Sequence, residues 1–352
     1  MWEHRSVVSL NDLRAVLAGL RRPEGGPLIM ATVVATRGST YRRPGARLLI
    51  SPSGWIAGSI SGGCIEAELQ GTAWKRTENG PVLETFDATS EGDAIWGYGL
   101  GCAGAVDVLL ERPSLENPAM SLLAKCVFDR QPVSVAYDLT PGPTLGSIYV
   151  EGGGTRAGLE LLARALDYVD STKPTIVHDG ERAVYVERVP AGFRLVIFGA
   201  GNDAIPLVRI ATEVGWSVIV VDRRPNYATS DRFPTADAVY TAPPEEMANQ
   251  ASLDANAYCV LMSHNYLSDL AVLRELGSTA TPYIGVLGPR IRTEKLLSEI
   301  DDASSISARV HGPIGLDIGA EGPESIALAI VAEIQAISAS RPLGLSPVRS
   351  QK

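Results

Sequence analysis

The sequence predicts an α/β protein of two domains, the second built on a doubly wound parallel sheet. From residue 193 onward, near-continuous apolar runs alternate with helical segments. Strands that are apolar on both faces are typical of parallel sheets covered by helices. Before residue 190 the strand-like runs are less regular, which predicts a mixed α/β domain. A chain of 352 residues can form two cores, so we expect domains over residues 1–190 and 191–352.

The first domain is expected to begin with a helix over residues 10–22, where leucine and valine recur at helical spacing after Asn11 and Asp12. Residues 65–76 follow Gly63 and are rich in helix formers, so a second helix is expected there. A third helix is expected over residues 155–169. Apolar, β-branched runs predict strands over residues 28–35, 47–51, 55–60, 105–111, 133–137, 147–150 and 183–189.

The second domain is expected to repeat strand and helix in regular order. Its last helix should cover residues 323–338, because a proline in the first turn and nearby glutamates are helix start signals. Earlier helices are expected after Gly201, Pro243, Asn265 and Arg290. Strands are expected over residues 195–198, 218–221, 257–262 and 283–287.

The first strand of the second domain runs directly into Gly199-Ala200-Gly201, and a helix follows. In a Rossmann-type domain the first glycine makes a tight turn and the second lets the backbone approach a pyrophosphate, which the helix N-terminus attracts. Asp222 ends the next strand, where an acidic residue would hold a ribose hydroxyl. The pattern predicts nucleotide or phosphate binding by Gly199, Gly201 and Asp222. The alternative is a turn that needs glycine and binds nothing.

Three further side chains fall near the expected ligand edge of this domain. His264 ends a predicted parallel strand, where such folds place ligands, so it is a candidate binding residue. Arg223 and Arg224 follow Asp222. They either suit an additional phosphate or lie in solvent.

Arginines are concentrated in residues 37–47 of the first domain. Guanidinium groups suit phosphates and planar heterocycles. Arg42, Arg43 and Arg47 are therefore candidate ligands of anionic groups. The alternative is a solvated loop in an acidic protein.

Two cysteines lie beside glycines. In Ser61-Gly62-Gly63-Cys64, a flexible turn precedes a cysteine at the start of a helix, which should expose backbone N–H groups to an anion and favour the thiolate. Glu66 would accept a proton or fix this loop. Gly101-Cys102 lies in a glycine-rich stretch that a large ligand can approach. Thiolates suit soft metals, and the two loops suggest a shared site.

Each of these cysteines has an alternative interpretation as a small core residue. Cys126 and Cys259 lie in apolar runs, and we expect both in the core. With four scattered cysteines, a disulfide framework is not expected.

The charge balance limits the classes of partner. Thirty-one basic residues against forty acidic ones give a net charge of −9, which disfavours a generic binder of nucleic acid or anionic membranes. We find no signal peptide pattern and no apolar run of the roughly 18 residues needed to span a bilayer. A cytoplasmic protein is expected that contacts neither nucleic acid nor membrane.

Taken together, these segments resemble the XdhC/CoxI family of xanthine dehydrogenase accessory factors over nearly the whole chain. The sequence departs from the family pattern at Asn202, Ala103, Tyr266 and Pro289. The resemblance rests on residues 38–47, Ser61-Gly62-Gly63-Cys64-Ile65-Glu66, Gly99-Leu100-Gly101-Cys102, Gly199-Ala200-Gly201, Val221-Asp222-Arg223-Arg224, Arg232-Phe233-Pro234, Tyr283-Ile284-Gly285 and residues 311–320.

The resemblance implies a cofactor-binding chaperone rather than a catalyst, and no catalytic residue is assigned. Such a protein would bind the molybdenum cofactor, in its molybdopterin or dinucleotide form, and protect it during sulfuration. It would deliver the cofactor to a molybdenum hydroxylase of the xanthine dehydrogenase or CO dehydrogenase type. A cysteine desulfurase is a second implied partner, and a homo-oligomer is expected.

The resemblance implies that the cofactor-binding residues include the arginines and the Rossmann residues named above. They also include the loop residues Ser61, Gly62, Gly63, Cys64, Glu66, Gly101 and Cys102. Of these, Cys64 and Cys102 would lie at the molybdenum or sulfur end of the cofactor. NAD(P) or another nucleotide is a further candidate ligand of the Rossmann domain. One alternative function is an NAD(P)-dependent oxidoreductase with residues 1–190 as substrate domain. A regulatory nucleotide sensor is another.

Overall fold

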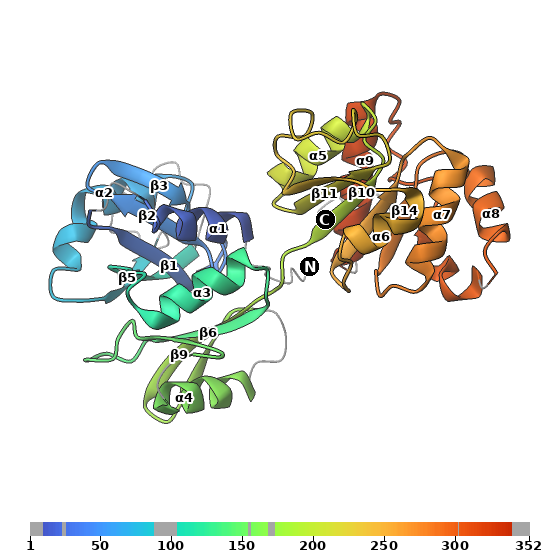
Figure 1. The fold of residues 1–352 in the computed structure, drawn as a ribbon. Coiled ribbons are helices and arrows are strands. Elements are labelled where there is room, and N and C mark those ends of the chain that lie inside the picture. Colours follow the sequence, from blue (N-terminus) through green and yellow to red (C-terminus); the bar gives the residue numbers. More distant parts are fainter. Residues whose placement is uncertain are drawn as a thin grey trace, which may run out of the picture. The chain divides into compact units, whose positions relative to one another are not determined.

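The computed structural model describes residues 10–22, 26–87, 104–153, 156–167, 173–301 and 303–339. The chain divides into two compact units, Met1–Ala191 (unit 1) and Gly192–Lys352 (unit 2), coloured blue to green and yellow to red in Figure 1. No helix in the described part of the chain is long and apolar enough to cross a membrane.

The first half of unit 1 forms an antiparallel sheet, here called sheet A, with five strands among the described residues. Helix α2 (Cys64–Arg76) covers one face, where Ile65 and Leu69 pack on the apolar side chains of the strands. In spatial order the strands are β3 (Gly54–Gly58), β2 (Arg47–Ser51), β1 (Ile29–Gly38), β5 (Gly104–Glu111) and β4 (Val82–Asp87).

The second half of unit 1 forms sheet B, also antiparallel. Helix α4 (Arg156–Asp167) covers its outer face (Figure 1). Helices α1 (Leu10–Gly19) and α3 (Pro118–Phe128) join the core shared by the two sheets. In spatial order the described strands of sheet B are β7 (Ile148–Val150), β6 (Val133–Asp138), β9 (Arg182–Val189) and β8 (Thr175–Asp179).

Unit 2 is a Rossmann-type domain with a parallel sheet, as the sequence predicts. Numbered within the unit, its described strands have the order 3-2-1-4-5-6, which is the order of dinucleotide-binding folds. The strands are β12 (Ala238–Thr241), β11 (Ser217–Asp222), β10 (Arg194–Phe198), β13 (Ala257–Leu261), β14 (Tyr283–Val286) and β15 (Val310–His311).

Helices cover both faces of this sheet (Figure 1). On one face α5 (Ala204–Glu213) and α9 (Pro323–Ser338) pack on residues such as Leu195 and Val218. On the other face lie α6 (Met247–Gln250), α7 (Tyr266–Gly277) and α8 (Arg290–Ser298). The 3-10 segments η1 (Pro244–Glu246), η2 (Ala303–Ser305) and η3 (Ser307–Arg309) lie in connections.

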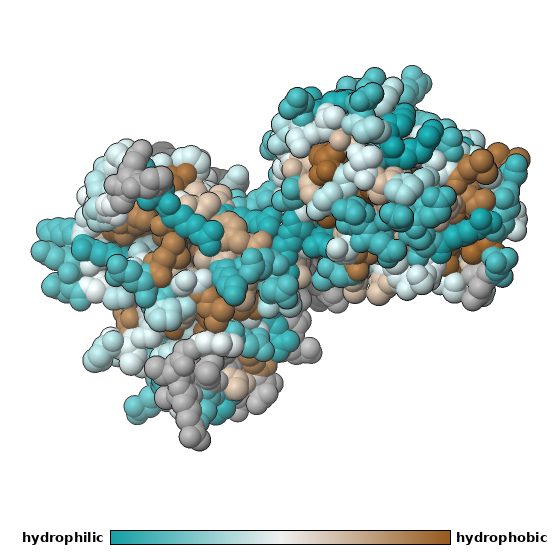
Figure 2. Space-filling view, in the orientation of Figure 1, coloured by the Kyte–Doolittle hydropathy of each residue, from teal (hydrophilic) through white to brown (hydrophobic). Residues whose placement is uncertain are grey.

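Apolar side chains gather over α7 and α8 on the face drawn in Figure 2. Leu267 and Ile291 are 73% and 74% exposed, and each is the second residue of its helix. The two helices begin after β13 and β14, so this apolar surface borders the carboxyl ends of the parallel strands.

Apart from 3-10 segments, five described elements were not expected from the sequence: β4, α3, β8, β12 and β15. Strand β12 lies at the sheet edge and is only half-buried, and β15 has two residues, so neither shows a continuous apolar run. Helix α3 does carry a start signal, because the Asn117 side chain accepts the Ala119 N–H and proline follows at its first position.

Candidate functional site

The described loops that carry predicted residues of unit 1 lie at one end of sheet A. Strand β1 ends at Gly38, which pairs with Gly104 at the start of β5, and the neighbouring β4 ends at Asp87. Strand β2 begins and β3 ends toward the same end of the sheet. Residues 39–46 and residues 59–63 therefore leave the sheet at this end, as do Asp87 and Gly104, the described residues that flank segment 88–103. We call this the unit 1 edge. Gly101 and Cys102 lie outside the described residues.

The loop before Cys64 is organised around the Glu66 carboxylate. Its Oε1 accepts the N–H groups of Ile60 and Ser61, at 2.8 and 2.7 Å, and its Oε2 accepts the Gly63 N–H at 3.1 Å and the Ser61 hydroxyl. Burial raises the pKa of Glu66, but the hydrogen bonds from Ser61 and the backbone outweigh burial and hold this pKa below its usual value. Of the two roles considered for Glu66, the geometry favours fixing the loop.

The sequence predicts that backbone N–H groups of this turn donate to an external anion, but in the structure they donate within the protein. The N–H groups of Ile60, Ser61 and Gly63 donate to Glu66, and the Ile65 N–H donates to Ser61 Oγ at 3.2 Å. An internal carboxylate therefore occupies the position predicted for a bound anion. Those N–H groups are unavailable to a ligand while Glu66 stays ionised.

Cys64 is the first residue of α2 and is half-buried, with its Sγ 3.6 Å from Ser61 Oγ. Gly62 and Gly63 are exposed, and a Cβ added to either would meet no atom within 4 Å. Gly63 has a φ of 117°, which requires glycine. The thiol thus lies beside an open turn.

The other two described cysteines differ from Cys64. Cys259 lies fully buried in β13, as expected, while Cys126 is half-buried on α3. Burial raises the pKa of both thiols.

The arginines of residues 37–47 do not form one cationic cluster. Arg37 donates two hydrogen bonds to Asp107, at 2.6 and 3.0 Å, and Arg42 forms an ion pair with Asp12 of α1. Arg43 is exposed and makes no ion pair with any other described residue. Among the predicted anion ligands, Arg43 is therefore the best placed to meet an incoming group.

Arg47 requires a correction. Its side chain is 1% exposed and forms an ion pair with Glu187 of β9, inside the core between the two sheets. A buried guanidinium that already has a carboxylate partner is not accessible to a ligand. We therefore remove Arg47 from the anion-binding set.

Arg47 belongs to a buried polar cluster. Glu187 also accepts the Tyr185 hydroxyl at 2.7 Å, and Tyr137 and Glu111 are buried nearby. Burial raises the pKa of Glu111 to about 7, although the positive charge of Arg47 opposes the shift. No described residue is hydrogen-bonded to Glu111 Oε1.

In unit 2, the predicted residues meet at the carboxyl ends of β10, β11 and β13. Gly199 has a φ of 129°, and a Cβ there would lie 2.5 Å from the Met262 carbonyl oxygen. Only glycine fits this turn. Its N–H donates to the Val221 carbonyl at 2.9 Å, which ties the turn to β11.

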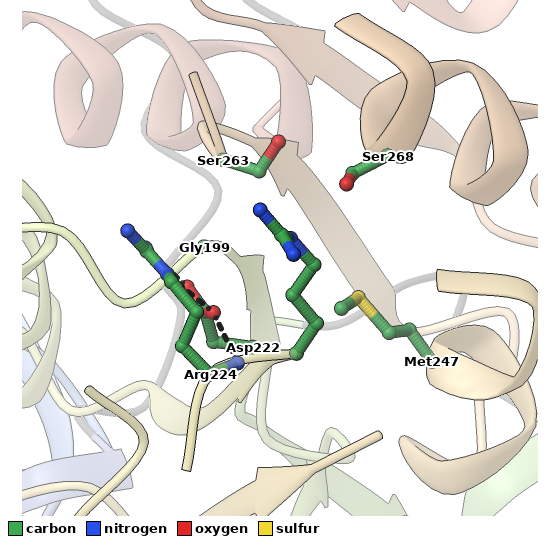
Figure 3. A pocket seen from close by; sticks show the side chains of 7 residues that line it. Gly199, Asp222, Arg224, Met247, Ser263 and Ser268 are labelled. Atoms are coloured by element: carbon green, nitrogen blue, oxygen red, sulfur yellow. Dashed lines mark hydrogen bonds and ion pairs between the residues drawn. The ribbon is translucent and has the colours of Figure 1, made fainter. Parts of the chain in front are cut away.

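Asp222 is 2% exposed and accepts four N–H groups. Its Oδ2 accepts the Ala200 N–H at 2.6 Å and Arg224 Nη2 at 2.7 Å, and its Oδ1 accepts the Arg224 N–H at 2.8 Å and Nε at 2.9 Å. Burial raises the pKa of Asp222, but the hydrogen bonds from Arg224 and Ala200 hold this pKa below its usual value. Figure 3 shows Arg224 against the Asp222 carboxylate.

A small pocket opens beside this pair (Figure 3). Sequence patterns did not indicate Met247, Ser263 or Ser268 as lining residues, because helical and loop residues of this kind have no fixed spacing from the glycine turn. The pocket is lined by Gly199, Asp222, Arg223, Arg224, Met247, Ser263 and Ser268.

His264 follows β13 with a φ of 56°, and its Nε2 lies 2.6 Å from Asp203 Oδ2 at the start of α5. The Asp203 carboxylate also lies against Gly201. The Asp203 carboxylate and His264 therefore lie together beside the glycine turn, at the start of α5. The sequence did not indicate Asp203, because an acidic residue in a first turn is common for dipole reasons alone.

Arg232 lies in the segment that follows β11, and its side chain hydrogen-bonds to the glycine turn. Its guanidinium donates to the Ala200 carbonyl at 2.6 Å, the Tyr227 carbonyl at 2.9 Å and Asn202 Oδ1 at 2.8 Å. Arg232 occurs in one of the motifs on which the family resemblance rests. That motif did not indicate that the Arg232 side chain would hydrogen-bond to the glycine turn.

Glu333 of α9 similarly fixes the segment after β15. It accepts the Tyr283 hydroxyl at 3.0 Å and the Gly315 N–H, and its Oε1 lies 3.4 Å from His311 Nδ1. Within the described residues, no group of three or more His, Cys, Asp or Glu side chains is placed to hold a metal ion.

Two family descriptions match the chain: the XdhC and CoxI family over residues 22–87 and the XdhC Rossmann domain over residues 195–334. The chain is 34% identical over 308 residues to a protein of Bacillus subtilis (strain 168) described as a probable xanthine dehydrogenase subunit, covering 87% of this chain and 92% of that protein. It is 23% identical over 338 residues to the molybdenum cofactor insertion chaperone PaoD of Escherichia coli (strain K12), covering 95% and 89%.

Among solved structures, the chain is similar to the crystal structure of a xanthine dehydrogenase from Bacillus halodurans. The TM-score is 0.75 at 28% sequence identity, and the match covers 96% of this chain and 98% of that one.

Proposed function

The chain belongs to the XdhC and CoxI family, and on that premise we propose that it binds the molybdenum cofactor and delivers it to a molybdenum hydroxylase. The relative named as a cofactor insertion chaperone and the relative named for xanthine dehydrogenase support this role. The proposal extends to protection of the cofactor during sulfuration. It also covers clients of the CO dehydrogenase type as well as the xanthine dehydrogenase type.

The observation that carries the proposal is the unit 1 edge. It presents a half-exposed thiol, Cys64, beside two glycines with open space in front of them, together with the exposed Arg43. A thiolate suits a soft metal–sulfur centre, and a guanidinium suits a phosphate. These residues therefore fit the two ends of the cofactor, which when bound would supply its molybdenum and terminal sulfur for transfer.

Ser61 and Glu66 have supporting positions in this proposal. They hold the Gly62-Gly63 turn and the start of α2 in place, so that Cys64 keeps a fixed position. Cys102 and Gly101 are proposed to complete the edge, because the described chain enters and leaves their segment there.

Finer features are proposed as well. Residues 1–190 form the domain that receives the cofactor, and residues 191–352 bind a phosphate or nucleotide through Gly199, Gly201 and His264. A cysteine desulfurase supplies sulfur to the bound cofactor. The protein works in the cytoplasm as a homo-oligomer.

The decisive experiment is anaerobic purification of the full chain from a host that makes the cofactor, followed by measurement of bound pterin and molybdenum. We expect both to co-purify with the protein, without turnover of NAD(P)H. An NAD(P)-dependent oxidoreductase would instead lack pterin and oxidise NAD(P)H in the presence of a substrate, and that combination would overturn the proposal.

A further inference from the structure

We propose that Arg224 makes the pocket of unit 2 selective for nucleotides that carry a phosphate on the ribose 2′ position, and disfavours nucleotides with a free ribose diol. The proposal rests on nucleotide binding by unit 2. It does not depend on cofactor delivery by unit 1.

Asp222 is already fully hydrogen-bonded within the protein. An ionised carboxylate has about four lone-pair positions for hydrogen bonds. Asp222 uses four, one for Ala200 and three for Arg224, all between 2.6 and 2.9 Å. A ribose hydroxyl that reached Asp222 would find no acceptor position left. The acidic residue that marks a diol-binding site is thus present but already occupied.

The pocket carries a surplus of positive charge. Its lining includes two guanidinium groups, Arg223 and Arg224, and one carboxylate, Asp222. Arg224 neutralises Asp222, which leaves Arg223 as a surplus cation; it is exposed and makes no ion pair with other described residues. The Ser263 and Ser268 side chains line the same pocket (Figure 3). The Ser263 hydroxyl already donates to Asp269, so the preference for a phosphate group rests on the Arg223 guanidinium.

The Arg224 side chain is held in place from two sides. Its guanidinium stacks over the Tyr227 ring, 3.9 Å from the ring centroid, while two of its nitrogens donate to Asp222. Asp222 is 2% exposed, whereas the Arg224 side chain is 35% exposed and covers the carboxylate from the solvent side. The Arg224 side chain is therefore preorganised in a position that blocks Asp222 from a ribose diol, while Arg223 remains to meet a phosphate.

Isothermal titration of the full chain with NADP⁺ and NAD⁺ tests the proposal. We expect NADP⁺ to bind at least about tenfold more tightly, with an affinity that falls as salt is raised. Adenosine 2′-phosphate should compete better than adenosine 5′-phosphate, and inorganic phosphate should compete weakly. Equal or tighter binding of NAD⁺, or no binding of either dinucleotide, would overturn the proposal.

Single substitutions distinguish the role of Arg224 from that of Arg223. Arg224→Ala frees Asp222, so NAD⁺ affinity should rise while NADP⁺ affinity falls. Arg223→Ala removes an exposed side chain without disturbing Asp222, so NADP⁺ affinity should fall with no gain for NAD⁺. Arg290→Ala is the matched control, because Arg290 is exposed on α8 and pairs with Glu294 within its own helix.

An Arg224→Ala protein that loses both dinucleotides equally, while its thermal unfolding midpoint matches wild type, would contradict the assigned role. If Arg224→Ala does not fold, Arg223→Ala still decides the matter: unchanged NADP⁺ affinity would refute a phosphate subsite. Pterin content should be the same in wild type and both variants. Failure of this proposal is thereby distinguished from failure of cofactor binding.

Discussion

Gly199 is fixed by its backbone conformation and by the end of β13. Its φ of 129° is strained for any other residue, and an added Cβ would lie 2.5 Å from the Met262 carbonyl oxygen and 2.6 Å from the carbonyl carbon. Backbone atoms cannot give way as a side chain can. The nearest atom to a Cβ on Gly201 belongs instead to the flexible Asp203 carboxylate.

We predict that Gly199→Ala lowers the free energy of unfolding by about 3 kcal/mol or more, whereas Gly201→Ala costs less than about 1 kcal/mol. Urea unfolding of the two variants beside wild type makes the comparison. Equal losses for both would show that the turn is not held against Met262 as described.

Glu111 makes the stability of unit 1 depend on pH. Its pKa of about 7 lies above the ordinary value of 4.5, so between these values the folded protein holds a proton that the unfolded chain has lost. Stability is then full below the ordinary value and falls as pH rises to about 7. At roughly 1.4 kcal/mol per pKa unit, the total loss is about 3 kcal/mol.

Glu111→Gln should remove this loss and be more stable than wild type at about pH 8. The measurement is urea unfolding between about pH 5 and about pH 8. Glu78→Gln, at an exposed glutamate of the same unit, is the control and should keep the wild-type slope. A Glu111→Gln protein that also keeps that slope contradicts the assignment.

At the scale of elements, the start of α2 depends on one carboxylate. Glu66 collects three backbone N–H groups and the Ser61 hydroxyl, so it ties the end of β3 to the first turn of the helix. Because these bonds lower the pKa of Glu66, they contribute stability above the usual glutamate pKa. That stability is lost as pH falls through the lowered value.

Glu66→Gln should destabilise unit 1 by about 2 kcal/mol, because an amide places donors where the backbone also donates. The loosened turn should also let Cys64 react faster with a thiol reagent. Both effects can be measured on one preparation by thermal unfolding and by absorbance of the released reagent, again with Glu78→Gln as control. Unchanged stability and unchanged Cys64 reactivity would argue against the bonding described.

Regular elements could be predicted from local pattern, and paired side chains could not. The glycine turn, Asp222 and the parallel strands follow from apolar runs and spacing. The partners Arg47–Glu187, Asp222–Arg224 and Asp203–His264 depend on the positions of side chains in the folded chain. Arg47 has the neighbours of a loop cation, yet β9 supplies its counter-charge from 140 positions along the chain.

At the scale of the whole molecule, the family could be identified from motifs in order along the chain, and the comparisons confirm it. We propose a different binding role for each of the two compact units. Unit 1 presents its cysteine-bearing edge, and unit 2 presents a Rossmann pocket. The cysteine loops remain the proposed site of the cofactor, because the glycine turn of unit 2 is shared by many nucleotide-binding proteins.

The central claim is that the unit 1 edge holds the molybdenum cofactor. The most direct measurement is the pterin content per chain of anaerobically purified Cys64→Ala, Cys102→Ala and Cys126→Ala proteins beside wild type. We predict that the first two lose most of the bound pterin, while Cys126→Ala, a change on α3 at a half-buried thiol, retains it. Full retention of pterin by a protein lacking both Cys64 and Cys102 would contradict the claim.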